Sequence, residues 1–264
     1  MHSQIHSTRL HIAASLNGLA ALYVPQERYA EAEDFYQRAL QLLRQFVGEI
    51  HPHIATTLNG LAELYRIQKK YSKAEPLHKQ ALHLRQQLFN ELHPDVATSL
   101  NNLALLHTDQ GQYSEAEPLY LRVLQIQRQL FGQNHRAVAN TLNNLAALYA
   151  YWKRFSEAEL RFVQALKMCQ QILGKEHPDT IHTCVSLAGL YFTLERYSEA
   201  EPLYLQTLDT WMKCPSERNF YTQRVCNDFY ALIKQVVESD RTQELSSHPI
   251  TQALLQEVQL QNDR

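Results

Sequence analysis

Four asparagines stand at one repeated place in the chain, and they are the side chains best suited to recognising a ligand. They are spaced 42 residues apart, at Asn17, Asn59, Asn101 and Asn143. A carboxamide both donates and accepts hydrogen bonds, so a row of them can pair with the N–H and C=O groups of an extended peptide. The same amides could instead bond to the next repeat and fix its stacking. The spacing therefore predicts a peptide-binding row or a stacking contact.

Further side chains share the predicted helix faces of these asparagines. The additional candidates for contact with a peptide are Thr56, Glu63, Arg66, Thr98, Asn140 and His182. Glu63 and Arg66 are the only charges in the central stretch of this face. The face also carries Ala147, Val185 and Gly189, and it turns apolar at Val185 and Phe192. We expect these residues to line one groove.

The histidines and cysteines do not predict a metal site. Of the 13 histidines, neither His51-x-His53 nor His78 with His83 has the i, i+4 spacing that places two imidazoles on one helix face. A repeated set recurs every 42 residues at predicted helix starts, which indicates a structural role: His51, His93, His135 and His177. The cysteines form no CxxC pair, which is typical of reduced thiols in a cytosolic protein. Cys184 and Cys226 fall at apolar repeat positions and are predicted to lie in the core.

The composition excludes several classes of protein. The chain has 264 residues but only 7 Gly and 9 Pro, where average usage would supply about 18 and 13. This composition argues against glycine-dependent hairpins and phosphate-binding loops, and no segment offers a base with an oxyanion-stabilising loop. The net charge of −2 gives no basic excess for nucleic acid or an anionic membrane. We expect a cytoplasmic protein that is not an enzyme and that needs no cofactor.

A repeat with a period of 42 residues organises the chain. Ala-Glu recurs five times, at Ala32-Glu33, Ala74-Glu75, Ala116-Glu117, Ala158-Glu159 and Ala200-Glu201. An upstream block keeps the same step, with LNGLAALY at 16–23, LNGLAELY at 58–65 and LNNLAALY at 142–149. Self-similarity at such a period is typical of a solenoid, because each unit buries its apolar face only against its neighbours.

Each repeat is predicted to contain two helices. The first begins at a His-Pro pair, with the proline at the first helical position, as at Pro52, Pro94 and Pro178. The second begins with a capping box, as in Ser72-x-x-Glu75, preceded by an aromatic residue. Ala30 replaces the serine in the first copy, so that cap should be weaker by about 1 kcal/mol.

Prolines and glycines mark the ends of the second helices. Pro76, Pro118 and Pro202 are placed in the first turn, where the carbonyl four residues earlier would belong to a non-helical cap. A left-handed stop is expected near Gly48, Asn90, Gly132 and Gly174. Alanines recur in both helices, at Ala20 and Ala62 among others, and should let paired helices approach closely.

The pattern resembles the tetratricopeptide repeat. Leu58, Leu61, Ala62, Tyr65, Ala74, His78 and Ala81 match its spacing, and the 42-residue form with LNNLA and Y-x-E-AEPLY is similar to the repeats of kinesin light chains. The resemblance implies an all-α, right-handed superhelical solenoid whose first helices line a concave groove. Only eight residues precede the first repeat, which argues against a motor adaptor with an N-terminal coiled coil. Asn stands where some members have the lysine of a carboxylate clamp, which argues against that kind of co-chaperone.

The C-terminal part departs from the repeat. We expect a tail at 1–8, five repeats at 9–215 and a degenerate sixth repeat at 216–264 that caps the stack. Asn227 and Phe229 keep their repeat places, and Asp240-x-x-Gln243 is a second capping box, but Pro249 interrupts the following helix. Trp152 and Trp211 are expected to pack gaps between repeats or to contact a ligand.

Two functions remain open from the sequence. The first is a non-enzymatic scaffold that holds a protein or an extended peptide segment in the groove. The second is a structural module that assembles through its exposed repeat ends. Either way the partner is predicted to be protein, not nucleic acid or membrane, and the chain to be a monomer or weakly self-associating.

Overall fold

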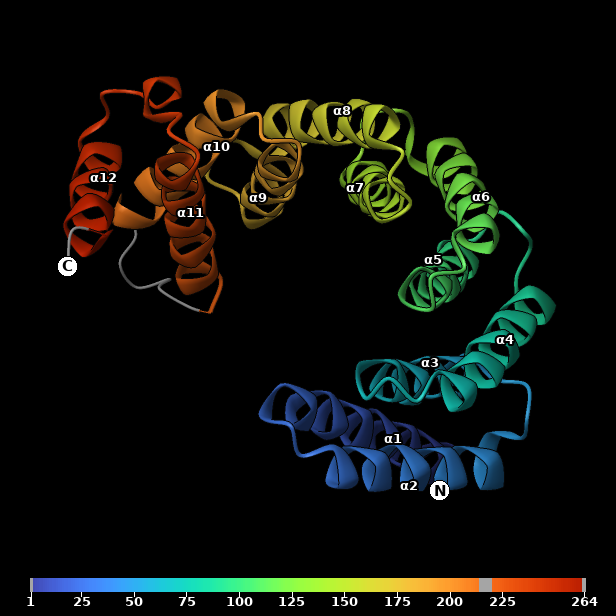
Figure 1. Cartoon of the computed structure of the whole chain (residues 1–264). Coiled ribbons are helices and arrows are strands. Elements are labelled where there is room, and N and C mark those ends of the chain that lie inside the picture. Colours follow the sequence, from blue (N-terminus) through green and yellow to red (C-terminus); the bar gives the residue numbers. More distant parts are fainter. Residues whose placement is uncertain (1, 214–219, 263–264) are drawn as a thin grey trace. The chain divides into compact units, whose positions relative to one another are not determined.

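The computed structural model describes the backbone of residues 2–213 and 220–262. Contacts divide the chain into two compact units, Met1–Gln133 and Asn134–Arg264, each of which is described by itself. The first unit contains α1 (His2–Tyr23), α2 (Tyr29–Val47), α3 (Pro52–Ile67), α4 (Tyr71–Leu88), α5 (Pro94–Asp109) and α6 (Tyr113–Phe131). The second contains α7 (Arg136–Tyr151), α8 (Phe155–Leu173), α9 (Pro178–Thr193), α10 (Tyr197–Lys213), α11 (Phe220–Glu238) and α12 (Pro249–Asn262) (Figure 1).

Consecutive helices pack in pairs, which confirms the predicted all-α repeat fold. In the first unit α1 packs on α2, α3 on α4 and α5 on α6, and α2 also packs on α3 and α4 on α5. In the second unit α7 pairs with α8 and α9 with α10, followed by α11 and α12. The repeated alanines Ala20, Ala62 and Ala74 are fully buried between these helices. Residues 2–8, which were expected to form a tail, belong to α1.

Histidine caps the first helices. Nδ1 of His51 accepts the backbone N–H of His53 at 3.2 Å, and Pro52 is the first helical residue of α3. The same contact recurs at 3.1 Å for His93, His135 and His177. An imidazole nitrogen here accepts the capping hydrogen bond that a Ser or Asp side chain usually accepts at an N-cap. The structural role predicted for this set of histidines is confirmed.

The predicted capping boxes of the second helices are wrong. α4 begins at Tyr71, so Ser72 lies inside the first turn, and the N-cap is Lys70, whose side chain makes no capping bond. The reason is the tight turn before it: Lys69 is left-handed (φ 58°) and the N–H of Lys70 bonds to the carbonyl of Tyr65 at 2.8 Å. This closes α3 in a Schellman-type turn and starts α4 immediately. Ala30 therefore removes no cap from the first repeat.

The left-handed turn recurs in the 42-residue register, mostly without glycine. It is occupied by Glu27, Lys69, Gly111, Lys153 and Glu195. Replacing Lys69 by glycine should raise the free energy of unfolding by up to about 1 kcal/mol, because the left-handed conformation costs a non-glycine residue about 1–2 kcal/mol and the added chain entropy of glycine offsets part of that gain. Urea unfolding of Lys69→Gly measures it. Gly111→Ala is the matched control and should lose about 1 kcal/mol; a neutral result for both changes would contradict the expectation.

Two other helix-end predictions need correction. Pro76, Pro118 and Pro202 lie within α4, α6 and α10, beyond the first turn. Pro76 and Ser72 are both exposed, so water can satisfy the Ser72 carbonyl that the proline leaves without a donor. At the other end, Gly48, Gly132 and Gly174 do follow α2, α6 and α8 with positive φ, but their ψ values are near 180° rather than in the left-handed helical region. Phe89 ends α4 in an extended conformation, so Asn90 is not a left-handed stop.

The glutamate of the Ala-Glu pair joins neighbouring repeats. The hydroxyl of Tyr65 on α3 donates to Glu33 on α2 at 2.7 Å, and that of Tyr191 on α9 donates to Glu159 on α8 at 3.1 Å. Each bond links a second helix to the end of the next first helix. The repeated glutamate thus fixes how one pair stacks on the next.

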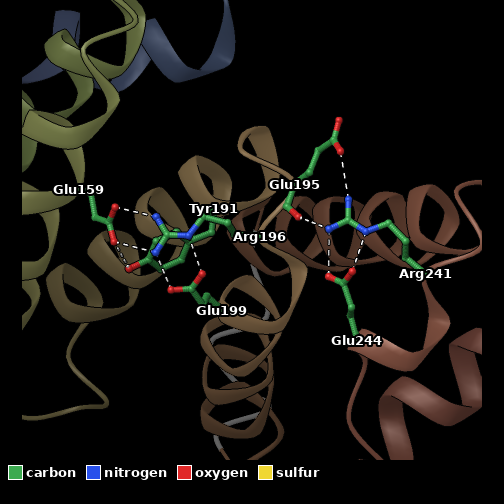
Figure 2. Close-up of polar contacts among 7 residues, drawn as sticks. All are labelled: Glu159, Tyr191, Glu195, Arg196, Glu199, Arg241 and Glu244. Carbon is green, nitrogen blue, oxygen red and sulfur yellow. Dashed lines mark hydrogen bonds and ion pairs between the residues drawn. The ribbon is translucent and has the colours of Figure 1, made fainter.

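Near the hairpin ends of the second unit, two arginine side chains each pair with glutamates (Figure 2). The guanidinium of Arg196 lies over the Tyr191 ring, 4.5 Å from its centroid, and pairs with Glu159 at 2.7 Å and Glu199 at 2.5 Å. Arg241 repeats this arrangement past the last full repeat. It lies over Tyr197, pairs with Glu244 at 2.6 Å, and donates to the backbone carbonyl of Glu195 at 2.8 Å. The C-terminal segment is therefore attached by the same device that links full repeats.

The C-terminal helix differs from the predicted sixth repeat. Asp240 is left-handed (φ 55°) and ends α11, so it does not begin a capping box. Pro249 begins α12 instead of interrupting it, after His248, whose Nδ1 accepts the N–H of Ile250 at 3.3 Å. Cys184 is buried as predicted, whereas Cys226 on α11 is exposed, so the prediction of a core position for Cys226 is wrong. The side chain of Trp211 and the predicted boundary at 215 lie outside the described residues.

Candidate peptide-binding groove

The repeated asparagines hold hydroxyl groups of the next first helix. Nδ2 of Asn17 on α1 donates to Oγ1 of Thr57 on α3 at 2.7 Å, and Nδ2 of Asn59 donates to Oγ of Ser99 on α5 at 3.0 Å. Asn59 is only 6% exposed. These bonds join one repeat to the next, as the stacking alternative predicts. The acceptors are hydroxyl groups of side chains. Whether the amides also touch a ligand stays a prediction.

His78 and Arg85 complete a buried polar cluster around Asn59. Nδ1 of His78 donates to Oδ1 of Asn59 at 2.9 Å, because the other end of the amide is itself the donor to Ser99. Burial lowers the pKa of His78 to about 4, so the imidazole is neutral. Arg85 donates to Ser99 at 2.9 Å and to the backbone carbonyl of Asp95 at 3.0 Å, and burial lowers its pKa as well.

Arg85 is a site residue that the sequence analysis missed. It is 5% exposed and donates weakly, at 3.4 Å, to the hydroxyl of Thr56, one of the predicted groove residues. The 42-residue register could have identified Arg85, because the first and fourth copies have Leu43 and Cys169 at the same place. The third copy has Gln127 there, so Arg85 is the one cation among the five copies, and apolar stacking alone does not explain it.

The two predicted groove charges form an ion cluster with a third residue. Arg66 pairs with Glu63 at 2.7 Å on its own helix and with Asp109 at the end of α5. Glu63 is the main cause of a raised pKa for Arg66. The cluster bridges two first helices and carries one net negative charge. Arg66 is thus engaged by carboxylates of the protein itself.

The remaining predicted residues lie at or near the surface of their own unit. Thr56 and Thr98 are exposed, and their hydroxyls donate back to the carbonyls of Pro52 and Pro94. Asn101 is half-buried on α5. The first unit therefore brings together seven of the ten predicted residues: Asn17, Thr56, Asn59, Glu63, Arg66, Thr98 and Asn101. The second unit holds the other three, of which Asn140 and His182 are exposed and Asn143 is buried.

A cavity of about 770 Å³ opens within the second unit. Its walls come from α7, α8, α9 and α11, and the α9 side is formed by His182, Val185 and Gly189. These residues, with Ala147 of α7, were predicted to face the groove; Asn140 and Asn143 do not line the cavity. A Cβ atom built at Gly189 would meet no atom within 4 Å, so there is open space at this wall.

Polar groups surround the apolar part of this cavity. Desolvation and the nearby Arg224 lower the pKa of His182. Arg224 and Asp228 of α11 are 3.8 Å apart, and Asp179 at the start of α9 pairs with Arg136 at 2.5 Å, which lowers the pKa of Asp179. The charges at the cavity are therefore balanced in pairs, while Val185, Ile181 and Val225 offer apolar surface. Such a site suits an uncharged, partly apolar segment.

The described residues contain no group of three or more His, Cys, Asp or Glu side chains placed to hold a metal ion. Burial raises the pKa of the Cys184 thiol to about 12, so this cysteine is not a thiolate nucleophile at neutral pH. None of the helices in the described part of the chain is long and apolar enough to cross a membrane.

Known proteins share this architecture. A kinesin light chain from Podosopora anserina with nearly identical TPR-like repeats is 22% identical and has a TM-score of 0.65, covering 79% of this chain and 98% of that one. BtubC (BKLC) from P. vanneervenii is 21% identical with a TM-score of 0.64, covering 83% and 94%. A Rap protein complexed with Competence and Sporulation Factor is 16% identical with a TM-score of 0.67, covering 100% and 79%.

The likeness to these solved structures concerns the fold. No curated protein matches the chain. The family model described as "Tetratricopeptide repeat" matches residues 11–87, 95–171 and 161–213, which is most of the chain and includes all five copies of the 42-residue pattern. The chain belongs to the tetratricopeptide repeat family.

Proposed function

We propose that this protein is a non-enzymatic scaffold that binds an extended segment of a partner protein along its first helices. The observation that carries the proposal is the cavity of the second unit, whose volume of about 770 Å³ can take several side chains of a peptide. Membership of a family of protein-interaction scaffolds supports it. So does the Rap structure, a fold relative complexed with Competence and Sporulation Factor.

The chemistry of the cavity indicates the kind of segment. Apolar side chains of the peptide would contact Val185, Ile181 and Val225. The backbone of the peptide would form hydrogen bonds with His182 and Asp228. Because the acidic and basic groups there are paired with each other, a strongly charged segment would meet no uncompensated partner. We therefore propose an uncharged segment with at least one large apolar side chain as its anchor.

In the first unit we propose that the ligand contacts come from the exposed hydroxyls of Thr56 and Thr98 and from Asn101. Asn59 would act mainly through Ser99 and His78, by holding α3 and α5 at the correct distance. Replacing Asn59, Asn101 and Asn143 together by alanine separates the two roles. A lower melting temperature with unchanged affinity would assign them to stacking, and lost affinity in a stable variant would assign them to the ligand.

Filling the cavity should abolish binding without unfolding the protein. Gly189→Leu adds a side chain where no atom lies within 4 Å, and it removes a helix-interior glycine that costs about 1 kcal/mol. We expect a peptide selected on the wild-type chain by phage display to lose at least about tenfold in affinity by calorimetry, while the variant unfolds no more easily than wild type.

Gly18→Leu is the matched control. Gly18 is also a helical glycine with no atom within 4 Å of a built Cβ, but it lies on α1, in the other unit. The control should gain similar helix stability and keep the affinity of the selected peptide. Equal binding by Gly189→Leu and wild type, or failure to select any peptide, would refute the proposed cavity site.

A further inference from the structure

A stripe of large apolar side chains is exposed along α1. Ile12, Leu19 and Leu22 are 46%, 41% and 62% exposed, and Ser15 between them is also exposed. The four residues follow a 3-4-3 spacing, which is the a/d pattern of a two-helix coiled coil. Contiguous exposed apolar side chains of this kind mark an interaction surface.

The repeat register identifies what normally covers this stripe. The equivalent residues 42 positions later, Ile54, Leu61 and Leu64 on α3, are at most 5% exposed. They lie in one apolar cluster with Tyr36 and Leu40 of α2, the second helix of the preceding pair. On α1 no described element occupies that place. The stripe is therefore a stacking face of the repeat that has no partner within the described chain.

The opposite end of the chain has a different chemistry. Leu260 is the one large apolar side chain exposed among the described residues of α12, at 65%. The other exposed side chains are mostly polar, including Gln252, Gln256, Glu257 and Gln259. Such a face does not match the α1 stripe, so head-to-tail stacking of two copies would bury amides and a carboxylate against leucine. The two ends are thus unequal, and the α1 stripe is the end that can bury apolar surface.

The stripe can pair with itself. Between Thr8 and Tyr23 the only charged side chain is Arg9, whose guanidinium lies over the ring of Phe46, 3.5 Å from its centroid. Two α1 helices can therefore meet without opposing like charges. We propose that a second copy of this chain docks α1 against α1 about a two-fold axis, with the stripe defined by Ile12, Ser15, Leu19 and Leu22 as the seam. This inference is independent of the proposed peptide site.

Sedimentation equilibrium of the full chain tests the dimer. The wild type should show a concentration-dependent monomer–dimer equilibrium. The double variant Leu19→Glu/Leu22→Glu should weaken association at least about tenfold, because each contact would place two carboxylates in an apolar seam. Leu160→Glu/Val163→Glu on α8 is the matched control, since these residues are 59% and 44% exposed. It should dimerise like wild type, and circular dichroism should show all three chains equally helical.

Disulfide cross-linking tests the two-fold arrangement. Ser15→Cys, in a chain with Cys214→Ser and Cys226→Ser, should form a covalent dimer on mild oxidation, because the two-fold axis brings Ser15 of both copies to the seam. A chain that is monomeric at all concentrations would overturn the proposal. So would a dimer that survives Leu19→Glu/Leu22→Glu, or a Ser15→Cys chain that dimerises but forms no disulfide between the two copies.

Discussion

Replacing Glu201 by leucine is expected to release the C-terminal helix from α10 and to lower the free energy of unfolding of the second unit by about 2–4 kcal/mol. Glu201 is the glutamate of the fifth Ala-Glu pair and is only 2% exposed. Its carboxylate accepts the backbone N–H of Ser246 at 2.8 Å, the Ser246 hydroxyl at 2.6 Å and the Thr251 hydroxyl at 2.6 Å. The substitution leaves the buried Thr251 hydroxyl without an acceptor, which costs about 1–3 kcal/mol. It also removes two charge-assisted hydrogen bonds from Ser246, which is exposed and can bond to water instead.

The register explains why this glutamate has new partners. Where α3 and α9 offer Tyr65 and Tyr191 to the preceding glutamate, α11 has Ile233, which is buried and cannot donate. The connection before α12 supplies Ser246 instead. In the first and fourth repeats the glutamate at this position binds the next repeat. Glu201 instead binds the non-repeat segment before α12.

Denaturant unfolding and amide hydrogen exchange measure this effect. Exchange should accelerate most between Ser246 and Val258, the segment that Glu201 holds. Glu157→Leu, a glutamate near the surface of α8, is the control and should change stability by less than about 1 kcal/mol. Removing the donors in Ser246→Ala/Thr251→Val should recover part of the loss in the Glu201→Leu background. Additive effects of the two changes would show that the three residues are not coupled.

Acidification is expected to destabilise the first unit through His78. Its pKa is about 4 in the folded protein, against 6.5 for an exposed histidine, and burial is the main cause. As the pH falls below 6.5 the unfolded chain takes up a proton before the folded one does. The contribution of His78 to stability is thus fully present above pH 6.5 and is lost between pH 6.5 and 4, by about 3 kcal/mol.

Tyrosine is the informative replacement for His78. Tyr36, Tyr120 and Tyr204 occupy the equivalent place in three other repeats, and all are buried. Urea unfolding between pH 7 and pH 4 should therefore show a stable His78→Tyr chain whose loss of stability on acidification is smaller than that of wild type by about 3 kcal/mol. Parallel pH curves for the two chains would contradict the prediction, because they would mean that His78 has the same pKa in the folded and the unfolded chain.

The sequence predicts a local feature well where a single physical effect explains why a residue type stands at its position. The His-Pro starts, the buried alanines and the 42-residue period all follow from chain-local rules and are confirmed. The start of the second helix was missed because Ser-x-x-Glu suits a first turn as well as a cap. The left-handed turn at Lys69 gives no composition signal, since glycine is present in only one of its five copies.

Contacts between repeats are harder to predict than those within one. The pattern places Glu33 and Tyr65 on their helices, but their bond depends on the offset between two stacked pairs, which periodicity does not specify. The same is true of Arg85, whose partners come from α3 and α5. For the candidate site, the sequence predicted which residues face the groove, and Val185 and Gly189 do line the cavity. It could not predict that Asn59 bonds to Ser99 and His78, because these partners lie on other helices.

Hydrogen-bonded partners in neighbouring repeats keep a constant separation along the chain. Asn17–Thr57 and Asn59–Ser99 are each 40 residues apart, and Glu33–Tyr65 and Glu159–Tyr191 are each 32 apart. Excising one whole period would bring Asn17 opposite Ser99, another hydroxyl. An excision one residue longer would bring it opposite Leu100, which has no hydroxyl. One residue shorter would bring it opposite Thr98, an exposed residue whose hydroxyl already donates to the carbonyl of Pro94. We therefore expect that whole repeats can be gained or lost without disturbing these contacts, whereas single residues can be inserted only at the turns.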